Sequence, residues 1–185
     1  MLLNRGRIRP MMRNDLDRVL SWRNSERISR SMFSDHKITV EEHYNWFKGL
    51  KAEKDRYFVF ELDGQPVGLV YFNGIDSHNS KCSWGFYIGE NNQPRGTGLL
   101  LGYKGLEWVF NELEIRKLNS QSFAYNIASI NYHKKLGFVE EGLLKSELMK
   151  DSHYEDVLVL ALFAESWREH CCKVEKAIKG YEGAL

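Results

Sequence analysis

The order of its predicted strands and helices constrains the fold of this 185-residue chain more than any other sequence feature. After a short first strand and two helical segments, three strands are predicted in series before the first long crossover helix. A doubly wound dinucleotide-binding fold would alternate strands and helices from its start, so this order argues against one. We therefore predict an α/β (α+β) fold, with a mixed central sheet of about seven strands and helices on both faces.

Apolar periodicity and turn signals place the individual elements. Asp63-Gly64 favours a hairpin, and Thr39 with Glu42 forms a capping box at a helix start. The predicted strands are Arg7–Pro10, Tyr57–Leu62, Pro66–Phe72, Ser83–Gly89, Lys117–Ala124, Phe138–Met149 and His153–Phe163. The predicted helices are Asp15–Arg23, the segment from Thr39 to about Leu50, Leu99–Leu113, and the segment between Asn126 and Gly137.

The balance of charge and the length exclude several classes of protein. The 26 Lys and Arg residues nearly match the 25 Asp and Glu residues, so we expect no nucleic-acid partner and no electrostatic membrane binding. The longest apolar run, Val157–Ala164, has 8 residues and is too short to span a bilayer. We predict one domain over residues 1–168 and a helical or flexible tail over residues 169–185. This tail could pack on the domain or on a second subunit, which leaves a homodimer open.

The three cysteines show no metal-binding spacing, so no metal is predicted. Cys171 and Cys172 are adjacent, Cys82 stands alone, and reduced thiols are the simplest interpretation. The first residues include a charge at Arg5, which is too early for the apolar region of a secretory segment. We therefore expect a cytoplasmic protein.

A glycine-rich hexapeptide between a predicted strand and the long helix is the strongest chemical signal. It reads Gln93-Pro94-Arg95-Gly96-Thr97-Gly98. Its glycines allow a ligand close to the backbone, and the following helix directs free N–H groups and its positive dipole end there. Arg95 adds a cation. The segment favours a pyrophosphate site, although a plain glycine-rich turn would also fit, and it is not a Walker loop.

A second segment lies about 30 residues downstream, from Asn126 to Phe138. Asn126 and Ser129 stand at a helix start, where side-chain oxygens cap N–H groups, and Gly137 closes the helix. Taken alone, this is ordinary helix punctuation. Together, the two segments resemble the GNAT superfamily of acyl-CoA-dependent N-acyltransferases, over roughly Arg7 to Phe163.

This resemblance implies that acetyl-CoA is the co-substrate, held where the fourth and fifth strands splay apart. Pantetheine would bond to backbone near Tyr87 and Ile88, and Asn126 and Ser129 would face the cofactor. The pyrophosphate would lie on the loop and the first helical turn. The predicted pyrophosphate contacts are Gln93, Arg95, Gly96, Thr97, Gly98, Leu99 and Leu100.

The chain departs from the family at the usual general acid, a tyrosine seven residues after the asparagine. Here that position is His133, and Tyr132 stands one step earlier. One step turns a helical side chain by about 100°, so the two cannot both face the departing thiol. We predict that one of them protonates the CoA thiolate: position favours His133, and phenol chemistry favours Tyr132. No residue stands out as a general base.

The N-terminal third resembles one branch of the superfamily, the N-acetyltransferases of pseudaminic acid synthesis. The resemblance is carried by Trp22-Arg23-Asn24, then Met32, then Ile38-Thr39 and the segment from Glu41 to Trp46. It implies a UDP-4-amino-4,6-dideoxy-N-acetyl-β-L-altrosamine acceptor, acetylated at its 4-amino group.

The predicted acceptor contacts suit a nucleotide-sugar. Arg23 can bind a diphosphate, and His43 can donate a hydrogen bond to a phosphate. Aromatic side chains and methionine can wall a uracil or the 6-methyl group, although such residues are usually core. The predicted contacts are Arg23, Met32, His43, Trp46, Phe47, Asn73 and Tyr87.

Two alternatives stay open at this point. A ribosomal-protein N-terminal acetyltransferase would have an acidic peptide groove instead of a basic, aromatic pocket. A non-catalytic acyl-CoA sensor would keep the phosphate loop without turnover.

Overall fold

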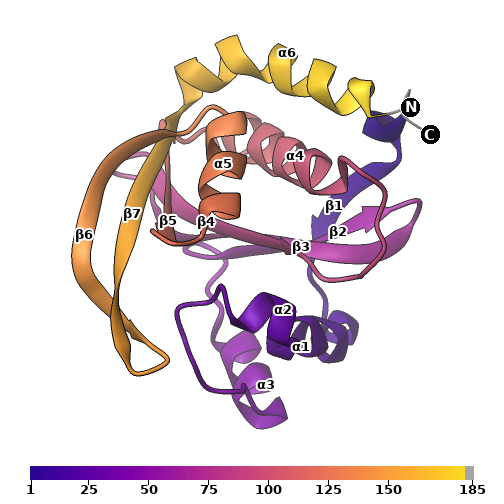
Figure 1. Ribbon diagram of the computed structural model, residues 1–185. Helices are drawn as coiled ribbons and strands as arrows, with labels where there is room; N and C mark the ends of the chain where they lie inside the picture. Colours follow the sequence, from indigo (N-terminus) through magenta and orange to yellow (C-terminus); the bar gives the residue numbers. More distant parts are fainter. Residues whose placement is uncertain (182–185) are drawn as a thin grey trace.

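A seven-stranded mixed sheet forms the centre of the computed structural model, which describes residues 1–181 (Figure 1). The strand order is β1-β2-β3-β4-β5-β7-β6; β4 and β5 are parallel, and the other neighbours are antiparallel. The strands are β1 (Gly6–Pro10), β2 (Arg56–Leu62), β3 (Gln65–Asp76), β4 (Lys81–Ile88), β5 (Lys117–Phe123), β6 (Val139–Lys150) and β7 (His153–Phe163). This architecture confirms the predicted fold.

Helices cover both faces of the sheet (Figure 1). One face carries α4 (Thr97–Asn111), α5 (Ile127–Lys135) and α6 (Ala164–Gly180); the other carries α1 (Leu16–Asn24), α2 (Glu26–Ser29) and α3 (Val40–Gly49). Short 3-10 turns, η1 (Leu2–Asn4) and η2 (Arg13–Asp15), flank β1. Because side chains alternate along a strand, β2 and β3 contribute to two separate apolar cores, one under each helical layer.

Most predicted boundaries agree with the structure to within two residues. Thr39 caps α3 as expected: its hydroxyl accepts from the Glu42 amide at 3.2 Å, and its own amide donates to the Glu42 carboxylate at 2.7 Å. β3 continues four residues beyond its predicted end at Phe72, because it pairs with β4 past a bulge. The four-residue helix α2 was not predicted, since one turn leaves no periodicity to detect.

β4 and β5 pair over only three residues and then separate. The pairs are Lys81 with Lys117, Cys82 with Leu118 and Ser83 with Asn119. Both strands continue beyond these pairs, β4 toward Ile88 and β5 toward Phe123. The sheet is therefore forked in its middle, as the family resemblance implied.

The helix α6 crosses the predicted domain boundary at residue 168 without a break. Trp167, Val174 and Ile178 are buried in the same core as α4, and the Trp167 indole donates to Glu107 at 3.1 Å. The predicted tail therefore packs on the domain over its described part; residues 182–185 lie outside the described residues. None of the described helices is long and apolar enough to cross a membrane.

Candidate active site

The fork between β4 and β5 opens into a cavity of about 810 Å³, which we call the fork cavity. It is bounded by both strands, by the start of α5 and by the segment that follows α2. Its lining includes Arg27, Asn73, Tyr87, Ile88, Ser120, Asn126, Ser129, Tyr132 and His133. Six of the residues predicted to bind the cofactor or to act in catalysis therefore share one cavity.

The glycine-rich loop ends at α4 in a conformation that glycine makes possible. Gly96 is the N-cap residue of α4 and has φ = 90°, in the left-handed region. The Thr97 hydroxyl donates to the Pro94 carbonyl at 2.8 Å and fixes the turn. The N–H groups of the first turn of α4, at Gly98 and Leu99, have no partner within the helix.

The other predicted loop residues have different exposures. Arg95 is exposed at the loop, and Gln93 donates to the Asn91 carbonyl at 3.1 Å. Leu99 and Leu100 place their side chains in the core, so only their backbone could contact a ligand. The loop thus offers free amides and a cation, which suits a pyrophosphate.

The start of α5 is organised by Asn126. Its side-chain oxygen accepts from the Ser129 amide at 3.1 Å and caps the helix, and both residues line the fork cavity. The capping interpretation is therefore confirmed for Asn126, and the side chains of both residues border the space in which the resemblance places the cofactor.

The phenol of Tyr132 points away from β5 and toward α4. It donates to the Gly98 carbonyl at 2.7 Å, and its ring packs on Phe86 with centroids 4.6 Å apart. Burial raises the pKa of Tyr132 well above its ordinary value. The phenol therefore ties α5 to the first turn of α4.

His133 points to the other side of α5, toward β5. Its Nε2 lies 2.8 Å from the Ser120 hydroxyl, and its Nδ1 lies 2.7 Å from the Ser129 carbonyl. The side chain is 2% exposed, and burial lowers its pKa to about 4. His133 is therefore neutral at pH 7, which makes it a poor direct proton donor in the resting enzyme.

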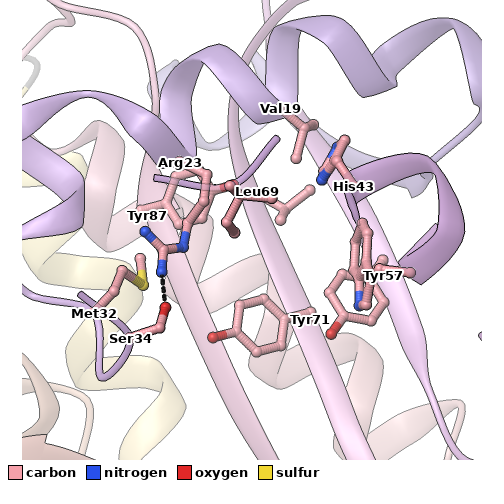
Figure 2. A pocket seen from close by; sticks show the side chains of 11 residues that line it. Val19, Arg23, Met32, Ser34, His43, Tyr57, Leu69, Tyr71 and Tyr87 are labelled. Atoms are coloured by element: carbon pink, nitrogen blue, oxygen red, sulfur yellow. Dashed lines mark hydrogen bonds between the residues drawn. The ribbon is translucent and has the colours of Figure 1, made fainter. Parts of the chain in front are cut away.

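A second, smaller cavity of about 240 Å³ lies under α1 and α3, and we call it the aromatic cavity (Figure 2). Its lining is Val19, Arg23, Met32, Ser34, Ile38, His43, Trp46, Tyr57, Leu69, Tyr71 and Tyr87. Residues lining both cavities are Arg23, Met32, Ser34, Tyr71 and Tyr87. The two cavities therefore meet at these side chains.

Arg23 is the charged group of the aromatic cavity. Figure 2 shows its guanidinium directed at Ser34, whose hydroxyl accepts from Nη2. Its Nη1 is buried and has no hydrogen-bond partner among the described residues. Burial lowers the pKa of Arg23 from its ordinary value, and no carboxylate forms an ion pair with it in the described structure. A half-buried cation with an unused donor is suited to an anionic ligand.

His43 and Trp46 stand on one face of α3 and stack with ring centroids 5.0 Å apart. His43 is 4% exposed, and burial lowers its pKa. Its Nε2 is buried without a hydrogen-bond partner in the described part of the chain. The cavity therefore holds a second unused polar atom against an aromatic wall.

Comparison with known proteins identifies the family. The family model described as "Acetyltransferase (GNAT) domain" matches residues 5–139. The chain belongs to the GNAT acetyltransferase family. This confirms the superfamily resemblance and makes the protein an N-acetyltransferase.

Two relatives of this GNAT acetyltransferase carry names that refer to different acceptors. Spermidine N(1)-acetyltransferase of Escherichia coli (strain K12) is 25% identical over 162 residues, which cover 87% of each chain. Putative ribosomal N-acetyltransferase YdaF of Bacillus subtilis is 24% identical over 105 residues, which cover 57% of each chain. Among solved structures, the Vibrio cholerae spermidine N-acetyltransferase in complex with CoA and spermine matches with a TM-score of 0.83. It is 22% identical and covers 89% of this chain and 99% of its own, which shows the shared fold.

Most of the residues predicted to contact the acceptor line one of the two cavities of this GNAT acetyltransferase. Arg23, Met32, His43, Trp46 and Tyr87 line the aromatic cavity, and Asn73 lines the fork cavity. The structure does not bring Phe47 to either lining. Phe47 packs against the apolar core under α1, which is the ordinary fate of an aromatic residue on an amphipathic helix.

Four residues in the cavity linings were missed by sequence reasoning. Tyr57 and Tyr71 are paired across β2 and β3 and stack with centroids 5.0 Å apart. Ser34 meets Arg23 from a segment 11 residues away, and Ser120 meets His133 across 13 residues. The strand alternation could have placed both tyrosines on one face, but no local pattern marks the two serines.

Proposed function

We propose that this GNAT acetyltransferase transfers the acetyl group of acetyl-CoA to an amine on an anionic acceptor, the 4-amino group of a UDP-4-amino-4,6-dideoxy sugar. The amine attacks the thioester directly, so no covalent enzyme intermediate forms. The observation that carries the proposal is the Arg23 guanidinium, which has an unused donor in an aromatic cavity without carboxylates.

Acetyl-CoA would occupy the fork cavity. The amides of Gly98 and Leu99 and the side chain of Arg95 would hold the pyrophosphate, since anions bind at helix N-termini. The backbone near Tyr87 and Ile88, left unpaired by β5 at the fork, would bond to pantetheine. The acetyl group would then meet the acceptor where the fork cavity joins the aromatic cavity, at Tyr87.

The acceptor would place its diphosphate on Arg23. A guanidinium binds phosphate bidentately, and burial strengthens such a charge-assisted bond. The uracil would lie among the aromatic side chains of α3, β2 and β3, where Trp46 contacts Tyr57 edge-to-face with ring centroids 4.9 Å apart. His43 Nε2 can accept a hydrogen bond from a ring N–H of the base.

A polyamine acceptor fits these cavities less well. Among the described residues, the linings of the two cavities taken together include no Asp or Glu; Arg23 lines both cavities, and Arg27 lines the fork cavity. A polycation would therefore enter a low-dielectric site that holds like charge and no counter-ion. One of the relatives is named for the polyamine spermidine, and another, YdaF, is named as a putative ribosomal N-acetyltransferase. The similarity to YdaF keeps N-terminal peptides as the second candidate acceptor.

The deciding experiment follows free thiol release from acetyl-CoA with three acceptors: the UDP-amino-sugar, spermidine, and a panel of N-terminal peptides. We expect release with the sugar and a product heavier by one acetyl group. In Arg23→Gln, the loss of a charged hydrogen bond worth about 1.5–3 kcal/mol should raise the sugar KM about 10- to 150-fold.

Arg18→Gln is the matched control, because Arg18 is exposed on the same helix outside both linings. The KM of Arg18→Gln for the UDP-amino-sugar should equal that of the wild type. Turnover of spermidine or of peptides without the sugar would overturn the acceptor assignment. Acetyl-CoA binding without thiol release from any acceptor would instead favour the sensor alternative.

A further inference from the structure

Ser120 stands at the point where the sheet forks. Asn119 is the last residue of β5 paired with β4, so Ser120 is the first residue beyond the pairing. Its side chain lies on the α5 side of the sheet, is 4% exposed and lines the fork cavity. A hydroxyl at this position faces the cavity that we assign to acetyl-CoA, and the sequence analysis assigned it no role.

The hydrogen bonds of His133 define where its proton is. The Ser129 carbonyl can only accept, so Nδ1, 2.7 Å away, carries the proton of the neutral ring. Nε2 therefore has a free lone pair, and the Ser120 hydroxyl donates to it at 2.8 Å. This leaves the Ser120 oxygen with lone pairs available to the cavity and its proton already directed at a base.

The ring of His133 cannot turn to another partner. It is enclosed by Trp84, Phe86 and Phe138, with centroids 5.8, 5.4 and 5.0 Å away. The adjacent Tyr132 ring is the one titratable group among these aromatic neighbours, and its phenol is bonded to Gly98. An apolar cage fixes the geometry of the pair and keeps the imidazole neutral.

We propose that Ser120 and His133 form a proton shuttle that carries one proton from the attacking amine to the departing sulfur. As the amine nitrogen bonds to the thioester carbon, the Ser120 oxygen takes a proton from that nitrogen and gives its own to His133 Nε2. As the carbon–sulfur bond breaks and its electrons pass to sulfur, Nε2 returns the proton to Ser120. Ser120 then passes a proton to the sulfur, so the products are an amide and a free thiol, and Ser120 and His133 are both back in their neutral starting state.

The low basicity of His133 serves the return step, because a weakly basic imidazole does not retain the proton. Ser120 is the catalytic residue of the pair, and His133 acts through it. The shuttle supplies the base that the sequence did not reveal and leaves Tyr132 to position the phosphate loop. It requires acetyl transfer to an amine, and it does not depend on which amine is the acceptor.

The first test is the tautomer of His133 in the free enzyme, read by ¹⁵N NMR of histidine-labelled protein at pH 7. We expect a protonated Nδ1 and an unprotonated Nε2, with the signal assigned by its loss in His133→Gln. Ser120→Ala should shift the Nε2 resonance, because the hydrogen bond to it is lost. A proton on Nε2 in the wild type would overturn the shuttle whatever the acceptor proves to be.

The second test is kinetic, with whichever amine the acceptor panel identifies. Ser120→Ala and His133→Gln should each lower kcat about 10²- to 10⁴-fold, with little change in the KM for acetyl-CoA. Their double variant should lose little more than either single variant, because they act as one unit. Ser120→Thr keeps the hydroxyl and should recover most of the turnover.

His133→Gln separates a shuttle from simple orientation. Glutamine can accept a hydrogen bond from Ser120 but does not take its proton, so an orienting role would survive this change. Asn119→Ala is the matched control, since Asn119 is the neighbouring residue on the same strand, lies outside both cavity linings and has no contact with His133 in the described hydrogen bonds. Near wild-type kcat in Ser120→Ala or in His133→Gln, or an equal loss in Asn119→Ala, would refute the proposal.

Discussion

Gly98 offers a change that separates cofactor binding from stability. A Cβ built on Gly98 would lie 4.0 Å from both Ile88 and Tyr132, so it meets ordinary contacts and no overlap in the protein. Both of these residues line the fork cavity. The added methyl of Gly98→Ala would therefore project into the space that we assign to the CoA phosphate and pantetheine.

Opposite effects on stability and on binding are expected in Gly98→Ala. Alanine in a helix is favoured over glycine by roughly 0.5–1 kcal/mol, so the free energy of unfolding should stay equal or rise. An extra methyl in a closely fitted site disfavours the bound state by about 1–3 kcal/mol. That range corresponds to a CoA dissociation constant about 5- to 150-fold higher.

The assays are isothermal titration with CoA and urea denaturation of the same preparations. Gly96→Ala is the contrasting variant, because Gly96 has φ = 90° and its Cβ would come within 2.7 Å of Tyr181. It should lose at least about 1–2 kcal/mol of stability, since L-residues avoid the left-handed region. A stable Gly98→Ala protein that binds CoA as tightly as the wild type would show that the cofactor does not pass this loop.

Two further changes test the hydrogen bonds that hold the site and the first strand. Tyr132→Phe removes the hydrogen bond from the phenol to the Gly98 carbonyl, so it should lower the free energy of unfolding by about 1 kcal/mol and raise the KM for acetyl-CoA. Its steady-state kcat should fall less than about tenfold. A much larger fall in kcat would make Tyr132 the general acid. Asp15→Asn breaks a bidentate pair with Arg9 at 2.7 and 2.8 Å and should lower the free energy of unfolding at pH 7 by about 1.5–3 kcal/mol. The Arg9 hydrogen bond holds the pKa of Asp15 below its ordinary 3.8, so the pair stabilises the fold above that pH and the effect disappears as pH falls through the lower folded value. Urea denaturation of the wild type and of Asp15→Asn at pH 7 and near pH 3 measures the difference in the free energy of unfolding, which should be smaller at pH 3; an equal difference at the two pH values would contradict the prediction.

Interactions between residues close in sequence were enough to predict the helix starts and the element order that position the site. Thr39 with Glu42 marked the start of α3, and the two-glycine loop marked the start of α4, because caps and left-handed turns depend on neighbouring residues. The element order excluded a doubly wound fold before any contact was known. Asn126 was placed correctly at the start of α5, since a cap is satisfied within the same helical turn.

The chemistry inside that frame was decided by tertiary structure. The one-residue step between Tyr132 and His133 showed that they must diverge, but only the packing of α5 between α4 and β5 directs one to Gly98 and the other to Ser120.

The acceptor side shows the same division between sequence and structure. The sequence identified Arg23 as a cation at the end of a helix, and the packing of α1 on the sheet left its Nη1 buried without a partner. Phe47 and Trp46 are adjacent on one helix and pack against the same core, and only the tertiary structure shows that Trp46 also lines the aromatic cavity. Helix starts, turns and element order depend on residues close in sequence, so the sequence by itself determined them. Unpaired donors, the contact between Ser120 and His133 and the depth of a cavity depend on segments of the chain that meet from far apart, and only the tertiary structure decided them.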